Sequence, residues 1–416
     1  MNSKVNEAVR YPGYRWFILA MAWLIFAMVL GGQMMISSFS FVLMPELNLT
    51  VSQLMLILSA PTLIAIFASL PGGVLGDRYG VRLMVGLGAV IVGVSGLLRA
   101  FSPDFGFMFA MMCLFGLGFA FIQPNLPKVV GTWFPPKQIG IASGIYNTGL
   151  GMGATFAFAT TVPLYGSNWR LGFVVMGIAA MVAGTIWWIF GRNTPKGVEP
   201  PPMPSVVPGL IAGVKSKNIW LLGIGMAALM GGFFGISGIL PHALEQVHEV
   251  IPATAALVVS VFTLGMVIGH VIFPLLSDRV GLRKPFIYVG AFVCAICLVF
   301  AWYTAFNAWT WVLMILGGLA LGAVPPLILA MPVELPEIGH QYVGSAAGIV
   351  LAVANVGGFL IPSFLIPSVE TPDMKMAFLT LAIVIGIIVI VAILLKETGS
   401  RAKARAAPPA RFNIDK

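Results

Sequence analysis

The sequence predicts an all-α integral membrane protein with twelve transmembrane helices in two pseudo-symmetric six-helix bundles. Of its 416 residues, 59% are hydrophobic and only 9% are charged, and the mean hydropathy is +0.99. Soluble domains carry about 25% charged residues, so lipid must be the solvent for most of this chain. Two further observations support this fold class: a series of long apolar runs, and a loop motif that occurs once in each half of the chain.

The apolar runs give the predicted spans, since a helix needs roughly 20 apolar residues to cross a bilayer. The first run is too long for a signal-peptide core and lacks a small-residue cleavage site, so we expect it to be retained. The predicted spans of the first half are 16–43, 51–72, 83–102, 106–132, 138–163 and 170–191. Those of the second half are 218–243, 252–276, 284–304, 309–333, 342–366 and 375–396.

A polar stretch containing the Pro-rich run Glu199-Pro-Pro-Pro-Met-Pro separates the two sets of spans. It predicts an N-terminal bundle over 1–192, a cytoplasmic linker over 193–217, a C-terminal bundle over 218–396 and a basic cytoplasmic tail over 397–416.

The distribution of Lys and Arg predicts the orientation. With twelve spans, all but three of the 23 Lys and Arg residues lie on the side of the two termini; the exceptions are Arg99, Arg170 and Lys375. Because positive residues concentrate on the cytoplasmic side, both termini are expected in the cytoplasm, and the chain in the cell's inner membrane. The net charge of +9 therefore indicates membrane topology and not nucleic-acid binding. Arg99 and Arg170 are interpreted as structural residues at outer helix ends.

The two halves of the chain repeat. Gly73-Val-Leu-Gly-Asp77-Arg78-Tyr-Gly80-Val-Arg82 matches Pro274-Leu-Leu-Ser-Asp278-Arg279-Val-Gly281-Leu-Arg283 at an offset of 201 residues. Four glycines of the first half have counterparts at a constant offset of 204: Gly118, Gly140, Gly144 and Gly153 match Gly322, Gly344, Gly348 and Gly357. A repeat of this length indicates a duplicated set of helices.

The Gly-x3-Asp-Arg-x-Gly-x-Arg loop after the second span resembles the signature loop of the major facilitator superfamily of secondary transporters. Together with the span count and the central linker, the resemblance covers nearly the whole chain. It implies two six-helix bundles around a central cavity that opens to one side of the membrane at a time, with the substrate near the midplane. It also implies a functional monomer, because the cavity lies within one chain.

Further segments resemble particular groups of transporters within this superfamily. Pro124-Asn-Leu-Pro-Lys-Val-Val-Gly-Thr-Trp-Phe and Gly140-Ile-Ala-Ser-Gly144 are similar to bacterial nitrate/nitrite and cyanate-type porters. The glycine-rich segments that begin at Asn147 and Asn355 resemble the signatures of nitrate porters. Those porters bind their anion with an arginine in the second helix of each half, whereas the spans 51–72 and 252–276 contain none. Nitrate itself is therefore not favoured.

The repeated loops predict a conformational latch. Gly73 lets a neighbouring helix approach, and Asp77 can accept hydrogen bonds from a helix N-terminus of the other half, near Gln341. Arg78 and Arg82 can hold the same carboxylate or a lipid headgroup. The predicted latch consists of Gly73, Asp77, Arg78 and Arg82 with Asp278, Arg279 and Arg283. The alternative is that these are only turn and topology residues.

Ionisable side chains inside a membrane are costly and therefore point to function. No Asp or Glu lies deep in a predicted span, which disfavours carboxylate-based proton coupling and leaves uniport, exchange or histidine coupling. His270 could bind an anion when protonated or accept a proton, and otherwise forms an interhelical hydrogen bond. Lys128 either extends to the headgroups or attracts substrate at the inner mouth of the cavity.

Uncharged polar residues near mid-depth complete the predicted cavity, because a buried amide or hydroxyl requires a hydrogen-bond partner. Phe233 could add an aromatic wall, although aromatic residues in spans usually only pack. Pro325-Pro326 is expected to break the tenth span. The uncharged polar candidates are Gln33, Ser37, Gln123, Asn125, Tyr146, Asn147 and Asn355.

The sequence contains no Walker loop, HExxH, nucleotide-binding glycine motif or Ser/His/Asp constellation, and its three cysteines lack zinc-site spacing. We therefore expect no enzyme activity, cofactor or metal. The prediction is a facilitative or secondary active transporter of a small monovalent anion, inorganic or a short carboxylate, with a coupled ion or exchanged solute left open. The alternatives are an exporter of amphipathic, drug-like compounds, a carrier of a quaternary amine held by aromatic faces, and a transport-inactive sensor.

Overall fold

The computed structural model describes residues 13–135, 138–195, 206–335, 337–338, 343–399 and 401. Within those ranges the chain is almost entirely helical, and eleven helices are long and apolar enough to span a membrane. The twelfth predicted span, 138–163, is also a continuous helix, α7 (Ile139–Tyr165). It is not among the eleven because its many Gly, Ser and Thr residues lower its hydropathy. The all-α membrane fold is confirmed.

The first half contains eight helices in the described residues. Polar side chains cap two helix starts: Asp104 accepts a hydrogen bond from the backbone N–H of Phe107, and Thr50 forms a capping box with Gln53. The helices are α1 (Tyr14–Ser38), α2 (Ser40–Glu46), α3 (Val51–Tyr79), α4 (Val81–Arg99), α5 (Phe105–Ile122), α6 (Leu126–Trp133), α7 and α8 (Trp169–Phe190).

The second half begins with α9 (Val206–Lys215), a helix inside the predicted linker. The helix of its second-to-last span continues as a π-helical turn, η3 (Ile361–Leu365), which a short helix follows before the last span begins. The remaining helices are α10 (Lys217–His248), α11 (Pro252–Val280), α12 (Lys284–Tyr303), α13 (Ala308–Leu321), α14 (Val324–Glu334), α15 (Val343–Leu360), α16 (Ile366–Ser368) and α17 (Lys375–Leu394).

Apart from the break at Phe39 between α1 and α2 and the π-helical turn after α15, two predicted spans are interrupted. The span 106–132 is divided between α5 and α6, and the span 309–333 between α13 and α14. In the second case Pro325 and Pro326 lie in the first turn of α14, where a missing N–H costs nothing. The expected break in the tenth span is therefore present, just before the two prolines.

The chain divides into two compact units. The first consists of Met1–Met203, Phe234–Thr263 and Phe359–Met374, and the second of Pro204–Phe233, Leu264–Gly358 and Lys375–Lys416. We call the helix ends that the charge distribution places in the cytoplasm inner ends, and the opposite ends outer ends. The outer parts of α10 and α11 thus belong to the first unit. The predicted bundle boundaries at 192 and 218 stay a prediction.

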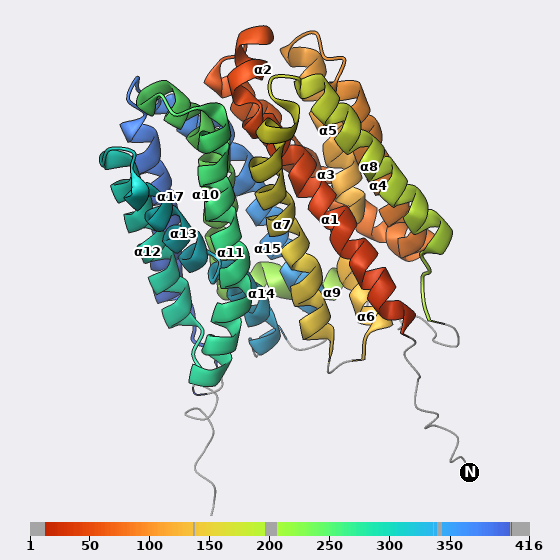
Figure 1. The fold of residues 1–416 in the computed structure, drawn as a ribbon. Coiled ribbons are helices and arrows are strands. Elements are labelled where there is room, and N and C mark those ends of the chain that lie inside the picture. Colours follow the sequence, from red (N-terminus) through yellow and green to blue (C-terminus); the bar gives the residue numbers. More distant parts are fainter. Residues whose placement is uncertain are drawn as a thin grey trace, which may run out of the picture. The chain divides into compact units, whose positions relative to one another are not determined.

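Small residues allow close helix packing within each unit. In the first unit α1 packs along α7, and α4 along α8 (Figure 1). A Cβ on Gly153 would overlap the carbonyl of Ala27, so the α1–α7 contact requires glycine there. In the second unit α12 packs against α13 and α17, and the rings of Trp302 and Phe378 stack with their centroids 4.0 Å apart.

Candidate functional site

Hydroxyl groups join helices of the two sequence halves at the outer end of the first unit. The Ser37 hydroxyl of α1 donates to the carbonyls of Ser237 and Gly238 in α10. The hydroxyl oxygens of Ser59 in α3 and Ser363 in η3 are 2.5 Å apart. Both contacts connect residues about 200 or more positions apart, so they hold the outer ends of the two halves together.

A third contact of the same kind joins α7 to α11. The hydroxyl oxygens of Thr155 and Thr263 are 3.0 Å apart, and Ser260 donates to the Thr155 carbonyl over 3.1 Å. We call the set Ser37, Ser59, Thr155, Thr263 and Ser363 the hydroxyl layer. None of its members carries a charge, so these outer contacts can separate without breaking an ion pair.

Just beside this layer lie two buried polar side chains that bind backbone carbonyls. Gln33 is 2% exposed and donates to the carbonyl of Leu58 over 2.8 Å. Arg99, at the end of α4, is 1% exposed and donates through Nη1 to the carbonyl of Gly32 over 2.9 Å. Gln33 and Gly32 are neighbours in α1. The two hydrogen bonds therefore link this part of α1 to α3 and to α4.

The surroundings of Arg99 are otherwise apolar. Its guanidinium lies 5.0 Å and 4.7 Å from the ring centroids of Phe115 and Phe173, and 3.3 Å from the Met112 sulfur. Its Nε has no hydrogen-bond partner, and no described carboxylate forms an ion pair with it. Among the residues that the structure describes, Arg99 is the one buried side chain with a permanent charge. The interior of the first unit therefore carries a positive charge without a carboxylate partner among the described residues.

The predicted latch of the first half has different partners from those expected. Lys128 of α6 forms an ion pair with Asp77 and donates to the carbonyl of Gly73 over 2.7 Å. Arg82 instead donates through Nε to the carbonyl of Trp188 over 2.8 Å. Arg78 lies 5.3 Å from the Tyr79 ring centroid. Gln341, the expected neighbour of Asp77, lies outside the described residues.

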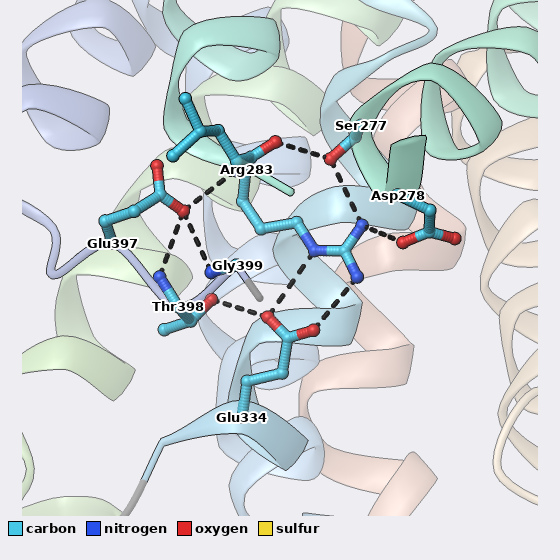
Figure 2. A network of polar contacts seen from close by, with 8 residues as sticks. Ser277, Asp278, Arg283, Glu334, Glu397, Thr398 and Gly399 are labelled. Atoms are coloured by element: carbon cyan, nitrogen blue, oxygen red, sulfur yellow. Dashed lines mark hydrogen bonds and ion pairs between the residues drawn. The ribbon is translucent and has the colours of Figure 1, made fainter. Parts of the chain in front are cut away.

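The repeat counterpart in the second unit is a larger network (Figure 2). The Arg283 guanidinium lies between two carboxylates, 2.6 Å from Asp278 and 2.9 Å from Glu334. Burial works against its charge, but the hydrogen bonds and charge of Glu334, and then those of Asp278, raise the Arg283 pKa overall. No ion pair of Arg279 is present in the described part of the chain.

The end of the last helix is fastened to this network. The Glu397 carboxylate accepts hydrogen bonds from the backbone N–H groups of Arg283 over 2.8 Å and of Lys284 over 3.1 Å. Thr398 donates to Glu334 over 2.6 Å. The segment after α17 is thereby tied to the loop between α11 and α12. Glu334 and Glu397 have no repeat signature, so the sequence comparison did not select them.

Three of the predicted cavity residues in the first unit contact neighbouring residues of the same unit. Asn125 lies at the break between α5 and α6 and donates to the carbonyls of Gly72, over 3.0 Å, and Phe121. Tyr146 packs on Phe26, with ring centroids 5.8 Å apart. Asn147 is exposed and donates to a carbonyl one turn earlier in α7. Gln123 is half-buried at the end of α5.

The other three predicted cavity residues lie in the second unit. Phe233 and Asn355 are buried, and His270 is half-buried in α11 without a hydrogen-bond partner among the described residues. Because the predicted set is divided between the two units, a single cavity lined by all of it stays a prediction.

Comparison with known proteins supports the fold and narrows the function. Residues 21–362 match the family model described as Major Facilitator Superfamily. A bacterial homologue of the human lysosomal transporter Spinster, solved in an inward-facing conformation, has the same fold. Its TM-score is 0.72 at 17% sequence identity, and the match covers 92% of this chain and 96% of that one.

Three relatives are named for a substrate and are more similar in sequence than the Spinster homologue. The hexuronate transporter of Bacillus subtilis is 29% identical over 157 residues, 36% of this chain and 36% of the relative. The nitrate/nitrite transporter NrtP of Nostoc punctiforme is 28% identical over 244 residues, 56% and 47% of the two chains. The probable nitrate/nitrite transporter NarK2 of Mycobacterium tuberculosis is 24% identical over 329 residues, 76% and 80%. The chain therefore spans less than half the length of the first two of these relatives, the hexuronate transporter and NrtP.

Proposed function

This chain belongs to the Major Facilitator Superfamily, and on that premise we propose that it carries a small monovalent anion across the membrane by alternating access. The anion is inorganic or a short carboxylate. The chain acts as a monomer in the cell's inner membrane with both termini in the cytoplasm, as its Lys and Arg distribution indicates.

The observation that carries the proposal is the buried charge of Arg99. A guanidinium in a low-dielectric interior, without a carboxylate beside it, creates a positive potential that extends well beyond its contacts. An anion roughly 10 Å away would gain about 1.7 kcal/mol at an effective dielectric constant of about 20, and a cation would lose as much. Arg99 therefore favours anions in the first unit without having to touch them.

The remaining polar groups suit the same role. Gln33 and the hydroxyl layer are neutral, so they can exchange hydrogen bonds with an anion or with each other without a second buried charge. Lys128 is engaged by Asp77, which favours a place in the latch over one in substrate attraction. His270 stays the candidate for direct anion contact in the second unit.

The relatives support an anion as well. Three of them are named as transporters of hexuronate, of nitrate or nitrite and, in a probable transporter of Bacillus subtilis, of galactarate or D-glucarate, which are all anions. These differ in size and shape, so they support the charge of the substrate and not its identity.

Alternating access fits the contrast between the helix ends. The hydroxyl layer consists of neutral hydrogen bonds, each worth about 1 kcal/mol net. The inner ends carry ion pairs, Lys128–Asp77 in the first unit and Arg283 with two carboxylates in the second, whereas the described ion pair at the outer end, Arg170–Glu46, lies within the first sequence half and does not join the two halves. We infer that substrate binding has to supply only a few kcal/mol to open the outer layer.

The test begins with a thermal-shift screen of the purified protein against nitrate, formate, acetate, glucuronate, choline and a lipophilic cation, since a bound ligand raises the melting temperature. Uptake of the stabilising anion is then measured in proteoliposomes for wild type, Arg99→Gln, Arg99→Lys and, as a control, Arg170→Gln. We expect Arg99→Gln to slow uptake about 20-fold, as a loss of about 1.7 kcal/mol implies, with Arg99→Lys and Arg170→Gln near wild type. A folded Arg99→Gln variant with wild-type uptake, or stabilisation by choline or the cation alone, would contradict the proposal.

A further inference from the structure

A second binding site lies at the inner end of the first unit and includes Arg82, which bonds to the Trp188 carbonyl while Lys128 pairs with Asp77. We propose that the pocket between the ends of α3, α4 and α8 binds the phosphate group of an anionic phospholipid. The pocket has a volume of about 440 Å³ and is lined by Tyr79, Arg82, Leu83, Trp188 and Asn193.

The lining of the pocket is mostly apolar and contains a few hydrogen-bond donors. Arg82 is held in place because its Nε and Nη2 both donate to the Trp188 carbonyl, which leaves Nη1 without a partner among the described residues. The Asn193 amide oxygen accepts from the backbone N–H of Arg82 over 2.9 Å, so its NH₂ group is left to donate. Tyr79, another lining residue, carries a hydroxyl group that can donate. No carboxylate lines the pocket, and a fixed guanidinium beside neutral donors suits a phosphate.

The walls of the pocket favour a lipid over free phosphate. Tyr79 is 52% exposed and Leu83 is 44% exposed, at the ends of two membrane-spanning helices. Tyr and Trp side chains gather at the headgroup level of a bilayer, and an exposed Leu beyond them would face acyl chains. The predicted orientation places this end in the cytoplasmic leaflet, which carries the anionic lipids.

The repeat counterpart of Arg82 supports the assignment by contrast. Arg283 occupies the same position in the second unit's motif, but Asp278 and Glu334 neutralise it. No described carboxylate forms an ion pair with Arg82. The arginine at this motif position is therefore paired with carboxylates in the second unit, whereas in the first unit it is available to an external anion.

The test is native mass spectrometry of the purified full chain with dioctanoyl phosphatidylglycerol, dioctanoyl phosphatidylcholine or inorganic phosphate. We expect one phosphatidylglycerol to bind, and Arg82→Gln to weaken it about tenfold or more, as the loss of a charge-assisted hydrogen bond implies. Asn193→Asp keeps the acceptor for the Arg82 N–H but places a negative charge in the pocket. It should weaken phosphatidylglycerol at least as much, and it decides the question if Arg82→Gln does not fold.

Lys217→Gln is the matched control, because it removes one exposed positive charge from an inner helix end of the second unit. It should bind phosphatidylglycerol as wild type does. Equal binding of phosphatidylcholine, complete displacement by an equal concentration of inorganic phosphate, or an equal loss in Lys217→Gln would each overturn the proposal. So would wild-type binding in a folded Arg82→Gln or Asn193→Asp variant.

Discussion

Ser59 and Ser363 are 304 positions apart in the sequence, yet their hydroxyl oxygens lie 2.5 Å apart at the outer end of the first unit. If this contact must open during transport, a covalent bond at the same place should stop the cycle. We predict that a Ser59→Cys/Ser363→Cys double variant, oxidised to a disulfide in proteoliposomes, loses at least nine-tenths of its substrate uptake, an expectation of roughly one order of magnitude. Reduction should restore uptake.

The single variants Ser59→Cys and Ser363→Cys are the controls and should be insensitive to the oxidant. The three native cysteines are not bonded to each other and lie in other helices. A quantitatively cross-linked protein that transports at the wild-type rate would show that this contact does not separate during the cycle.

Glu46 gives the outer end a pH-dependent contact. The Trp169 indole N–H donates to its carboxylate over 2.5 Å and Arg170 pairs with it, and together they lower the Glu46 pKa below its ordinary value of 4.5. A lowered pKa in the folded state contributes stability above the unfolded pKa and loses it as the pH falls through the folded value. We predict that the melting temperature of wild type exceeds that of Glu46→Gln by a constant margin from neutral pH down to about 4.5. Below that pH the margin should shrink. A margin that grew on acidification would contradict this.

The two carboxylates on Arg283 should not contribute equally. The Glu334 side chain is 16% exposed, whereas that of Asp278 is 61% exposed, so water screens the second pair. We predict that Glu334→Gln lowers the free energy of unfolding by about 2 kcal/mol, because it leaves a partly buried charge underneutralised. Asp278→Asn, the matched control, should cost at most about 1 kcal/mol. Unfolding in mixed micelles measures both, and equal losses would argue against burial as the cause.

Gly76 of α3 packs against Asn125, which lies at the break between α5 and α6. A Cβ at this position would overlap the amide group of Asn125, 2.6 Å from its Cγ, which the bond to the Gly72 carbonyl holds in place. We predict that Gly76→Ala destabilises the protein by about 1–3 kcal/mol, the usual cost of overpacking. A Cβ on Gly144 would meet nothing within 4 Å, so Gly144→Ala should be neutral or slightly stabilising. The two melting temperatures test the difference directly.

The fold could be predicted because the bilayer restricts the choices. In hydrocarbon every backbone group must be satisfied internally, so a run of about 20 apolar residues has to be a helix. The repeated Asp-Arg-x-Gly-x-Arg loops then indicated two related halves. The interruption before Pro325 followed from the missing N–H of proline.

The partners of individual side chains could not be predicted in the same way. A lysine near a helix end looks the same in sequence whether it extends to headgroups or, like Lys128, pairs with Asp77. Arg99 was assigned to a helix end because its burial depends on residues of three other helices, α1, α5 and α8. Of the hydroxyl layer, only Ser37 stood out, since Ser and Thr are common in membrane helices and carry no local sign of their partner.

Uptake by the wild-type protein tests the central claim most directly. Proteoliposomes and protein-free liposomes of the same lipid would be compared for uptake of radiolabelled formate, acetate and glucuronate, and of choline as the cationic counterpart, with nitrate followed by a fluorescent reporter. We predict protein-dependent, saturable uptake of at least one anion and uptake of choline equal to that of protein-free liposomes. Saturable choline uptake with no response to any of the anions would contradict an anion transporter.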